Sequence, residues 1–116
     1  MSAALAALLT LAACESSVDR QRAAICRRVL PAVNPAEADI RILRLAEGGT
    51  AETVRIDYAL TARPGRQFWA ICRFGPGAEL TAVTTERGAV SGASLYLMKR
   101  YYLDSPEAAA AEPAFR

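Results

Sequence analysis

The chain has 116 residues and a formal net charge of +2, from 14 basic and 12 acidic side chains, and it contains no histidine. This length suits one small domain, and the near-neutral charge favours no nucleic-acid partner. Histidine is the commonest general base and metal ligand. The sequence also shows no phosphate-binding loop, no nucleophile beside a base and no metal-ligand cluster. We therefore expect neither an enzyme nor a bound cofactor.

The first residues form an apolar run. Residues 2–13 carry no charged side chain and are almost all alanine and leucine. A membrane-spanning helix needs about 20 apolar residues, whereas the apolar core of a secretory signal is shorter. The alternative is a buried helix in which Cys14 is an ordinary core cysteine, but such a helix normally has a polar face.

The run ends in Leu11-Ala12-Ala13-Cys14, an aliphatic residue and two small residues before a cysteine. This segment resembles the lipobox of bacterial lipoproteins. The resemblance implies that residues 1–13 are a signal peptide and that Cys14 becomes the lipidated first residue. It also implies a location in the bacterial cell envelope, anchored in the membrane by this lipid and facing the periplasm. The following Glu15 leaves inner and outer membrane both open.

Behind the anchor the pattern predicts an α+β domain over residues 18–103. After a tether at residues 14–17, residues 18–30 have an amphipathic helical pattern. Residues 95–103 read as a second helix capped by Ser91 or Ser94, or as a fifth strand. Residues 104–116, rich in alanine and proline, are expected to be a mobile tail. Four strands separated by glycine-containing turns are expected between the helices, as an antiparallel meander sheet with the helices on one face, at residues 40–45, 53–60, 67–74 and 80–85.

Two cysteines remain once Cys14 is assigned to lipid. In an exported domain Cys26 and Cys72 are expected to form a disulfide. It would close a loop of about 47 residues and contribute about 4 kcal/mol in the chain-entropy model. In a reducing compartment they would instead be two separate buried thiols. Their spacing is not that of a C-x-x-C redox pair, and two cysteines are too few for a zinc site.

Two surface features are candidate binding sites. Trp69 and Ile71 alternate with residues assigned to the core, so they fall on the sheet face that the helices leave open. An exposed tryptophan is a common binding anchor, although a strand buried on both faces would give the same pattern. Lys99 and Arg100, followed by two tyrosines, could contact a membrane surface or a partner. The alternative is the solvated side of a terminal helix whose tyrosines cover the core.

These observations predict a membrane-anchored envelope lipoprotein that is not an enzyme and works by contact with an envelope protein. The alternative is a small periplasmic ligand-binding or inhibitory module that uses the sheet face around Trp69. A concave apolar pocket there would favour the second hypothesis, and a flat patch would favour the first. The leader is also similar to that of entericidin-like membrane-active lipoproteins, but this chain is much longer and patterned for a core.

Overall fold

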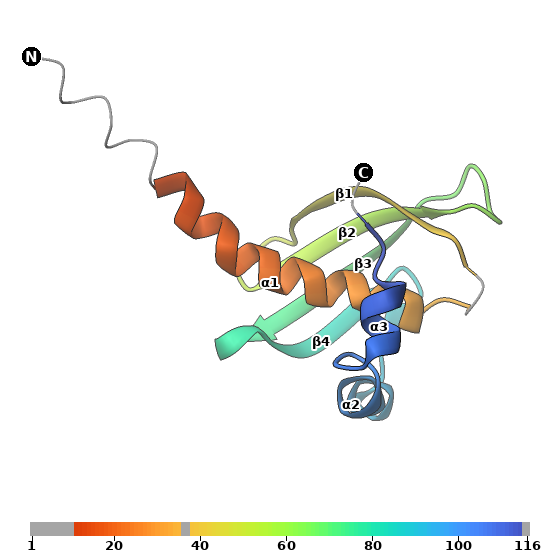
Figure 1. The fold of residues 1–116 in the computed structure, drawn as a ribbon. Coiled ribbons are helices and arrows are strands. Elements are labelled where there is room, and N and C mark those ends of the chain that lie inside the picture. Colours follow the sequence, from red (N-terminus) through yellow and green to blue (C-terminus); the bar gives the residue numbers. More distant parts are fainter. Residues whose placement is uncertain (1–10, 36–37, 115–116) are drawn as a thin grey trace, which may run out of the picture.

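The computed structural model describes residues 11–35 and 38–114, with side-chain surroundings from Arg20 onward. One antiparallel sheet has the strand order β1-β2-β3-β4-β5, so each strand pairs with its neighbours in the chain. Helix α1 crosses one face of this sheet, α3 packs beside α1, and α2 lies near β4 (Figure 1). The elements are α1 (Leu11–Ala32), β1 (Ile40–Glu47), β2 (Thr53–Leu60), β3 (Phe68–Gly75), the short 3-10 helix η1 (Pro76–Ala78), β4 (Glu79–Thr85), β5 (Gly88–Ala89), α2 (Gly92–Tyr101) and α3 (Pro106–Ala111).

The predicted α+β class is confirmed, and a strand is found at each of the four expected places. The sheet has a fifth strand, however, at a place that the sequence did not predict, whereas the fifth strand considered for residues 95–103 is not found because most of that segment belongs to helix α2 (Gly92–Tyr101). Strand β5 is only two residues long and pairs with the end of β4. Gly88 has φ of 117°, a conformation that costs glycine little, and it lets the chain turn back tightly onto β4.

Helix α1 is longer than predicted at its start. The expected helix covers residues 18–30, whereas α1 begins at Leu11 and includes the backbone of residues 14–17, which were expected to be a tether. Alanine and leucine are the best helix formers, and no proline or glycine interrupts the segment. Pro31 lies in the last turn, and the helix ends one residue later. Residues 1–10 of the predicted signal peptide lie outside the described residues.

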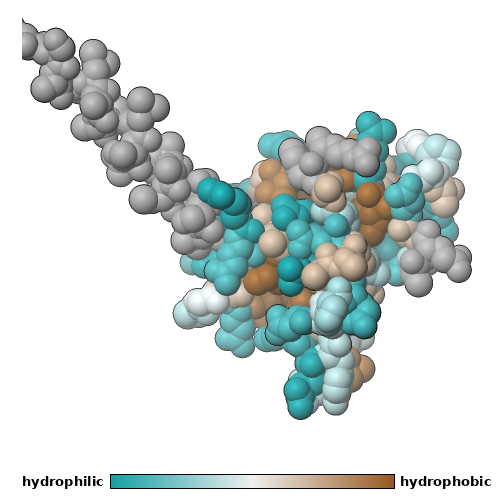
Figure 2. All heavy atoms as spheres, viewed as in Figure 1, coloured by the Kyte–Doolittle hydropathy of each residue, from teal (hydrophilic) through white to brown (hydrophobic). Residues whose placement is uncertain are grey.

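The core lies between α1 and the sheet. The alternation predicted for β2 is confirmed, because Val54, Ile56, Tyr58 and Leu60 are all buried. The ring of Tyr58 stacks on Phe68 with centroids 5.7 Å apart. Figure 2, which views the side that carries α1, shows hydrophobic residues between α1 and the strands, surrounded by hydrophilic ones. The remaining large buried side chains include Val29, Leu30, Ile42, Phe74, Leu80, Val83, Met98 and Leu103.

The segment 104–116, expected to be a mobile tail, contains helix α3. The Ser105 side chain caps this helix by accepting a hydrogen bond from the Ala108 backbone N–H at 3.1 Å. Ala108 itself is fully buried. Because alanine is small, α3 can approach α1 closely at Ala108, whereas the three alanines that follow it, residues 109–111, are exposed.

Candidate functional site

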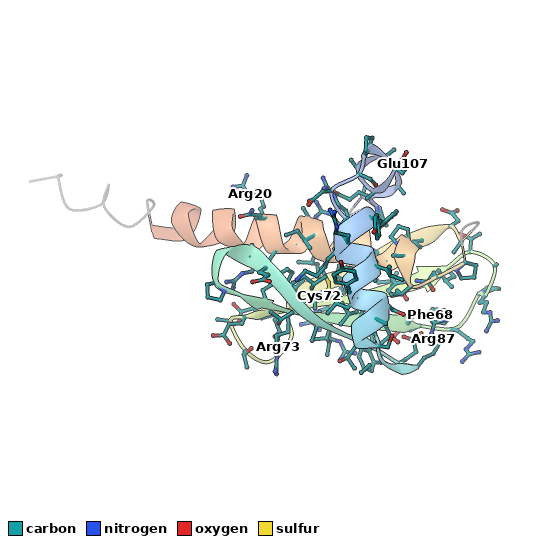
Figure 3. The ribbon with its side chains drawn as sticks, turned by 90° about the horizontal axis from the view of Figure 1, so that it is seen from below. Arg20, Phe68, Cys72, Arg73, Arg87 and Glu107 are labelled. Atoms are coloured by element: carbon teal, nitrogen blue, oxygen red, sulfur yellow. A yellow bond between two sulfur atoms is a disulfide. The ribbon has the colours of Figure 1, made fainter. Side chains whose placement is uncertain are left out.

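The disulfide predicted from the cysteine count is present. Cys26 in α1 and Cys72 in β3 are joined, with their Cα atoms 5.9 Å apart, and both residues are fully buried. Figure 3 shows Cys72 in the middle of the domain, beneath α1. The bond therefore ties the N-terminal helix to the central strand of the sheet.

The predicted lipidation site is only partly visible in the structure. The backbone of Cys14 belongs to α1, but its side chain lies outside the part that is described. Within the described residues, no helix combines the length and the apolar character needed to cross a membrane. Lipid attachment at Cys14 therefore stays a prediction.

The sheet face opposite α1 carries Trp69 and Ile71, as predicted. In the register of β2 and β3, Trp69 lies opposite Asp57 and Ile71 lies opposite Arg55. The Arg55 guanidinium stands 5.0 Å from the centroid of the Trp69 ring, within the range of a cation–π contact, and it pairs with Asp57 at 3.1 Å. Both apolar residues are half-buried. Trp69 is thus neither a free anchor nor a core residue, but the centre of a face whose rim is charged.

The predicted pair Lys99 and Arg100 is divided by the structure. The Lys99 ammonium bonds Glu79 of β4 at 3.3 Å and so holds α2 against the sheet. Arg100 is exposed and lies 5.6 Å from the ring centroid of its neighbour Tyr101. Of this pair, Arg100 alone is oriented toward solvent for a partner.

The outward side of α2 has an apolar character that was not predicted from the sequence. Tyr96, Leu97 and Tyr101 are 62%, 55% and 70% exposed. Ser91 caps the helix, its hydroxyl accepting a hydrogen bond from the Ser94 N–H at 3.1 Å. The 3.6-residue period of a helix could have revealed this side. Leu95, Met98 and Tyr102 lie on one stripe that packs against the core, and the three exposed residues fall outside that stripe.

The two larger hollows beside α2 lie on different sides of it. One, of about 540 Å³, lies between the end of α1 and the start of α2, where the Arg87 guanidinium donates to the Val33 carbonyl. The other, of about 450 Å³, runs along the side of α2 that includes Tyr96 and Arg100. Trp69 and Ile71 line neither of them. The sheet face around Trp69 is a patch rather than a wall of either hollow.

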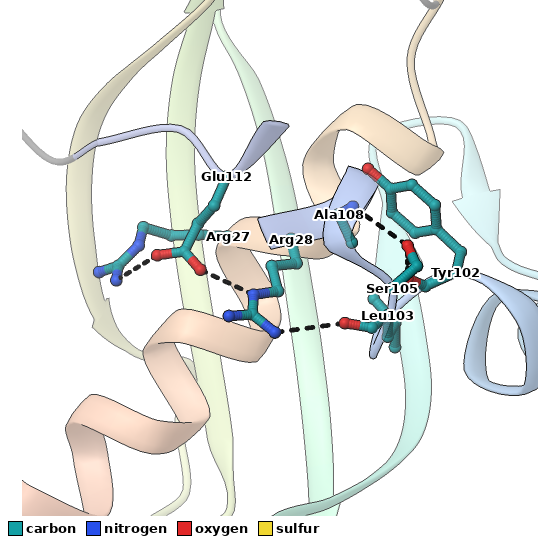
Figure 4. Close-up of polar contacts among 7 residues, drawn as sticks. All are labelled: Arg27, Arg28, Tyr102, Leu103, Ser105, Ala108 and Glu112. Atoms are coloured by element: carbon teal, nitrogen blue, oxygen red, sulfur yellow. Dashed lines mark hydrogen bonds and ion pairs between the residues drawn. The ribbon is translucent and has the colours of Figure 1, made fainter. Parts of the chain in front are cut away.

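A cluster of charges fixes the C-terminal helix to α1. The Glu112 carboxylate accepts hydrogen bonds from Arg27 Nη2 at 2.9 Å and Arg28 Nε at 2.8 Å, and Arg28 also donates to the Leu103 carbonyl (Figure 4). Burial alone would raise the pKa of Glu112, but the hydrogen bonds and charges of the two arginines outweigh it and leave the pKa below its usual value. This geometry is structural and offers no proton at neutral pH.

Among the residues that the structure describes, no group of three or more histidine, cysteine or acidic side chains is placed to hold a metal ion. Comparison with protein-family models, with curated proteins and with solved structures finds no match for this chain.

Proposed function

We propose that this protein is a membrane-anchored lipoprotein of the bacterial cell envelope that acts by contact with an envelope protein and catalyses no reaction. The proposal of an anchor is supported by Leu11-Ala12-Ala13-Cys14 at the end of an apolar run. The Cys26–Cys72 disulfide supports the same location, because disulfides persist mainly in oxidising compartments such as the periplasm.

The proposal that the protein acts by contact with another protein is supported by one observation, the exposed apolar side chains on the outward side of α2. Tyr96, Leu97 and Tyr101 leave large apolar surfaces in solvent on a helix of ten residues, and Arg100 lies among them. Contiguous exposed apolar patches mark interaction sites. Tyrosine and arginine are enriched in interface cores and among the residues that dominate binding energy.

The ligand-binding or inhibitor hypothesis has weaker support. It needs an accessible pocket around Trp69, but this ring is half-buried beneath Arg55 and lines neither hollow beside α2.

Intact mass spectrometry of the protein from the membrane fraction, with and without reduction, tests the anchor. We expect a chain that begins at Cys14, carries added diacylglycerol and gains two hydrogens when the disulfide is reduced. A chain that begins at Met1, with Cys14 unmodified and with free thiols, would contradict the proposal.

Site-specific photocrosslinking in cells tests the contact. A photoreactive amino acid in place of Leu97 is expected to give a discrete protein adduct, and the same probe in place of Arg63, exposed on the β2–β3 turn, is expected to give none. The adduct should disappear when Tyr96 and Tyr101 are both changed to aspartate, with the circular dichroism spectrum unchanged. Equal labelling from positions 97 and 63, or no adduct from 97, would argue against a contact through α2.

A further inference from the structure

The uncovered face of the sheet carries a second surface with a different chemistry. The strand registers place Arg41 and Arg44 of β1 and Arg73 of β3 on this face, together with Arg55, Trp69 and Ile71. Figure 3 shows Arg73 on the side of the sheet away from α1. We call these six residues the arginine face. Small side chains, Ala46, Ala59, Ala82 and Thr84, lie between them in the same rows of the sheet.

Three of these arginines have no acidic partner. Arg41, Arg44 and Arg73 are exposed, and in the described part of the chain their guanidinium groups make no ion pair or side-chain hydrogen bond. Elsewhere the fold provides oxygen partners for its arginines: these include Arg22, Arg27, Arg28 and Arg87.

On the arginine face itself, Asp57 forms an ion pair with Arg55 and lies opposite Arg44 in the sheet register without forming one with Arg44. With four arginines and one aspartate, the arginine face therefore presents an excess of positive charge around the half-buried Trp69 and Ile71. Glu86, whose carboxylate accepts a hydrogen bond from the Trp69 backbone N–H, is itself paired with Arg87. An apolar centre with a polar and charged rim is the usual anatomy of a protein interface.

We propose that the arginine face docks an acidic surface of a partner protein. This rests on the proposed function and deepens it, since it assigns a second contact surface and the charge of the surface that binds there. Charge complementarity supplies orientation and association rate in such contacts. At the usual rise and spacing of β-strands, the arginine face covers about 25 Å by about 15 Å. A surface of this size is typical of a transient protein contact rather than a permanent one. A second copy of this chain is a poor occupant, because a two-fold contact would bring like charges together.

The test is photocrosslinking from Ala82, a half-buried residue of β4 that lies opposite Arg73. In cells, a photoreactive amino acid at position 82 should give an adduct whose crosslinked partner peptide is rich in aspartate or glutamate. Changing Arg41, Arg44 and Arg73 together to glutamate should lower the adduct yield about tenfold. In isolated envelopes the yield should also fall as salt is raised.

A matched control separates the effect of charge on the arginine face from the effect of the net charge of the whole protein. Arg20, Arg63 and Arg66 are also exposed but lie outside both the arginine face and α2, and their change to glutamate alters the net charge by the same amount. The control should leave the adduct intact, and thermal unfolding should show that both triple variants fold.

Absence of an adduct from position 82, equal loss in both triple variants, or a label found on phospholipid, nucleic acid or a second copy of the chain would overturn the proposal. If the arginine face fails while the anchor and the α2 adduct are found, the proposed function stands without this surface.

Discussion

Reduction of the Cys26–Cys72 disulfide should strongly lower the stability of this domain. The two cysteines are separated by 46 residues. In the chain-entropy model, cross-linking a loop of that length lowers the entropy of the unfolded chain and stabilises the fold by about 4 kcal/mol at 25 °C. That is a large fraction of the stability of a small domain. For a domain of this size it corresponds to about 15–30 °C in Tm.

The assay is thermal unfolding followed by circular dichroism, with and without a reductant. Cys14→Ser removes the third thiol, so that the Cys26–Cys72 bond is the only thiol chemistry in the sample. The oxidised protein should unfold about 15–30 °C above the reduced protein. A variant with both Cys26→Ala and Cys72→Ala should show no response to reductant and should resemble the reduced protein. If reduction lowers the Tm of the oxidised protein by less than about 3 °C, the disulfide does not stabilise the fold by restraining the unfolded chain.

Three further changes test the C-terminal helix and the core. Glu112→Gln should cost about 1 kcal/mol at neutral pH by weakening both arginine contacts. Because the pKa of Glu112 is lowered in the folded protein, the difference from wild type should shrink as pH falls below the ordinary carboxyl pKa of about 4.3 and vanish only below the lowered folded pKa. In urea unfolding, Glu47→Gln at the exposed end of β1 should have little effect. Ala108→Leu should destabilise by about 1–3 kcal/mol through overpacking, whereas an unchanged urea midpoint would mean that α3 is not docked. Tyr58→Phe should cost about 1 kcal/mol, since the Tyr58 hydroxyl accepts a hydrogen bond from Asn34 Nδ2 at 2.9 Å. Burial raises the pKa of Tyr58, so the stability of the wild-type protein should fall as pH rises above about 10. An equal loss of stability above pH 10 in Tyr58→Phe, which has no hydroxyl to titrate, would contradict this explanation.

The sheet could be predicted because its signals are local. The alternation from Val54 to Leu60 identifies the core face of β2, and turns with glycine separate the strands. The disulfide followed from counting cysteines once Cys14 was set aside. None of these inferences required knowing which distant residues meet.

The missed features depend on distant contacts or on helical phase. Helix α3 is held by Ala108 packing and by Glu112, whose arginine partners lie 84 and 85 residues away in the chain. An alanine run does not reveal such partners. The outward side of α2 was missed because the two tyrosines after Arg100 were treated as one cluster, whereas the 3.6-residue period of a helix separates exposed Tyr101 from half-buried Tyr102.

The link between α1 and β3 also sets how the domain would respond to mechanical force. A pull applied between a lipid at Cys14 and a partner held on α2 reaches Cys26 and passes through the covalent bond directly to Cys72. Strands β1 and β2 lie in the bypassed loop and bear no tension. About 150 Å of chain, the extended length of that loop, therefore cannot be drawn out while the bond is intact. A lipoprotein that is pulled between a membrane and a partner would lengthen only by unravelling the segments outside the bond.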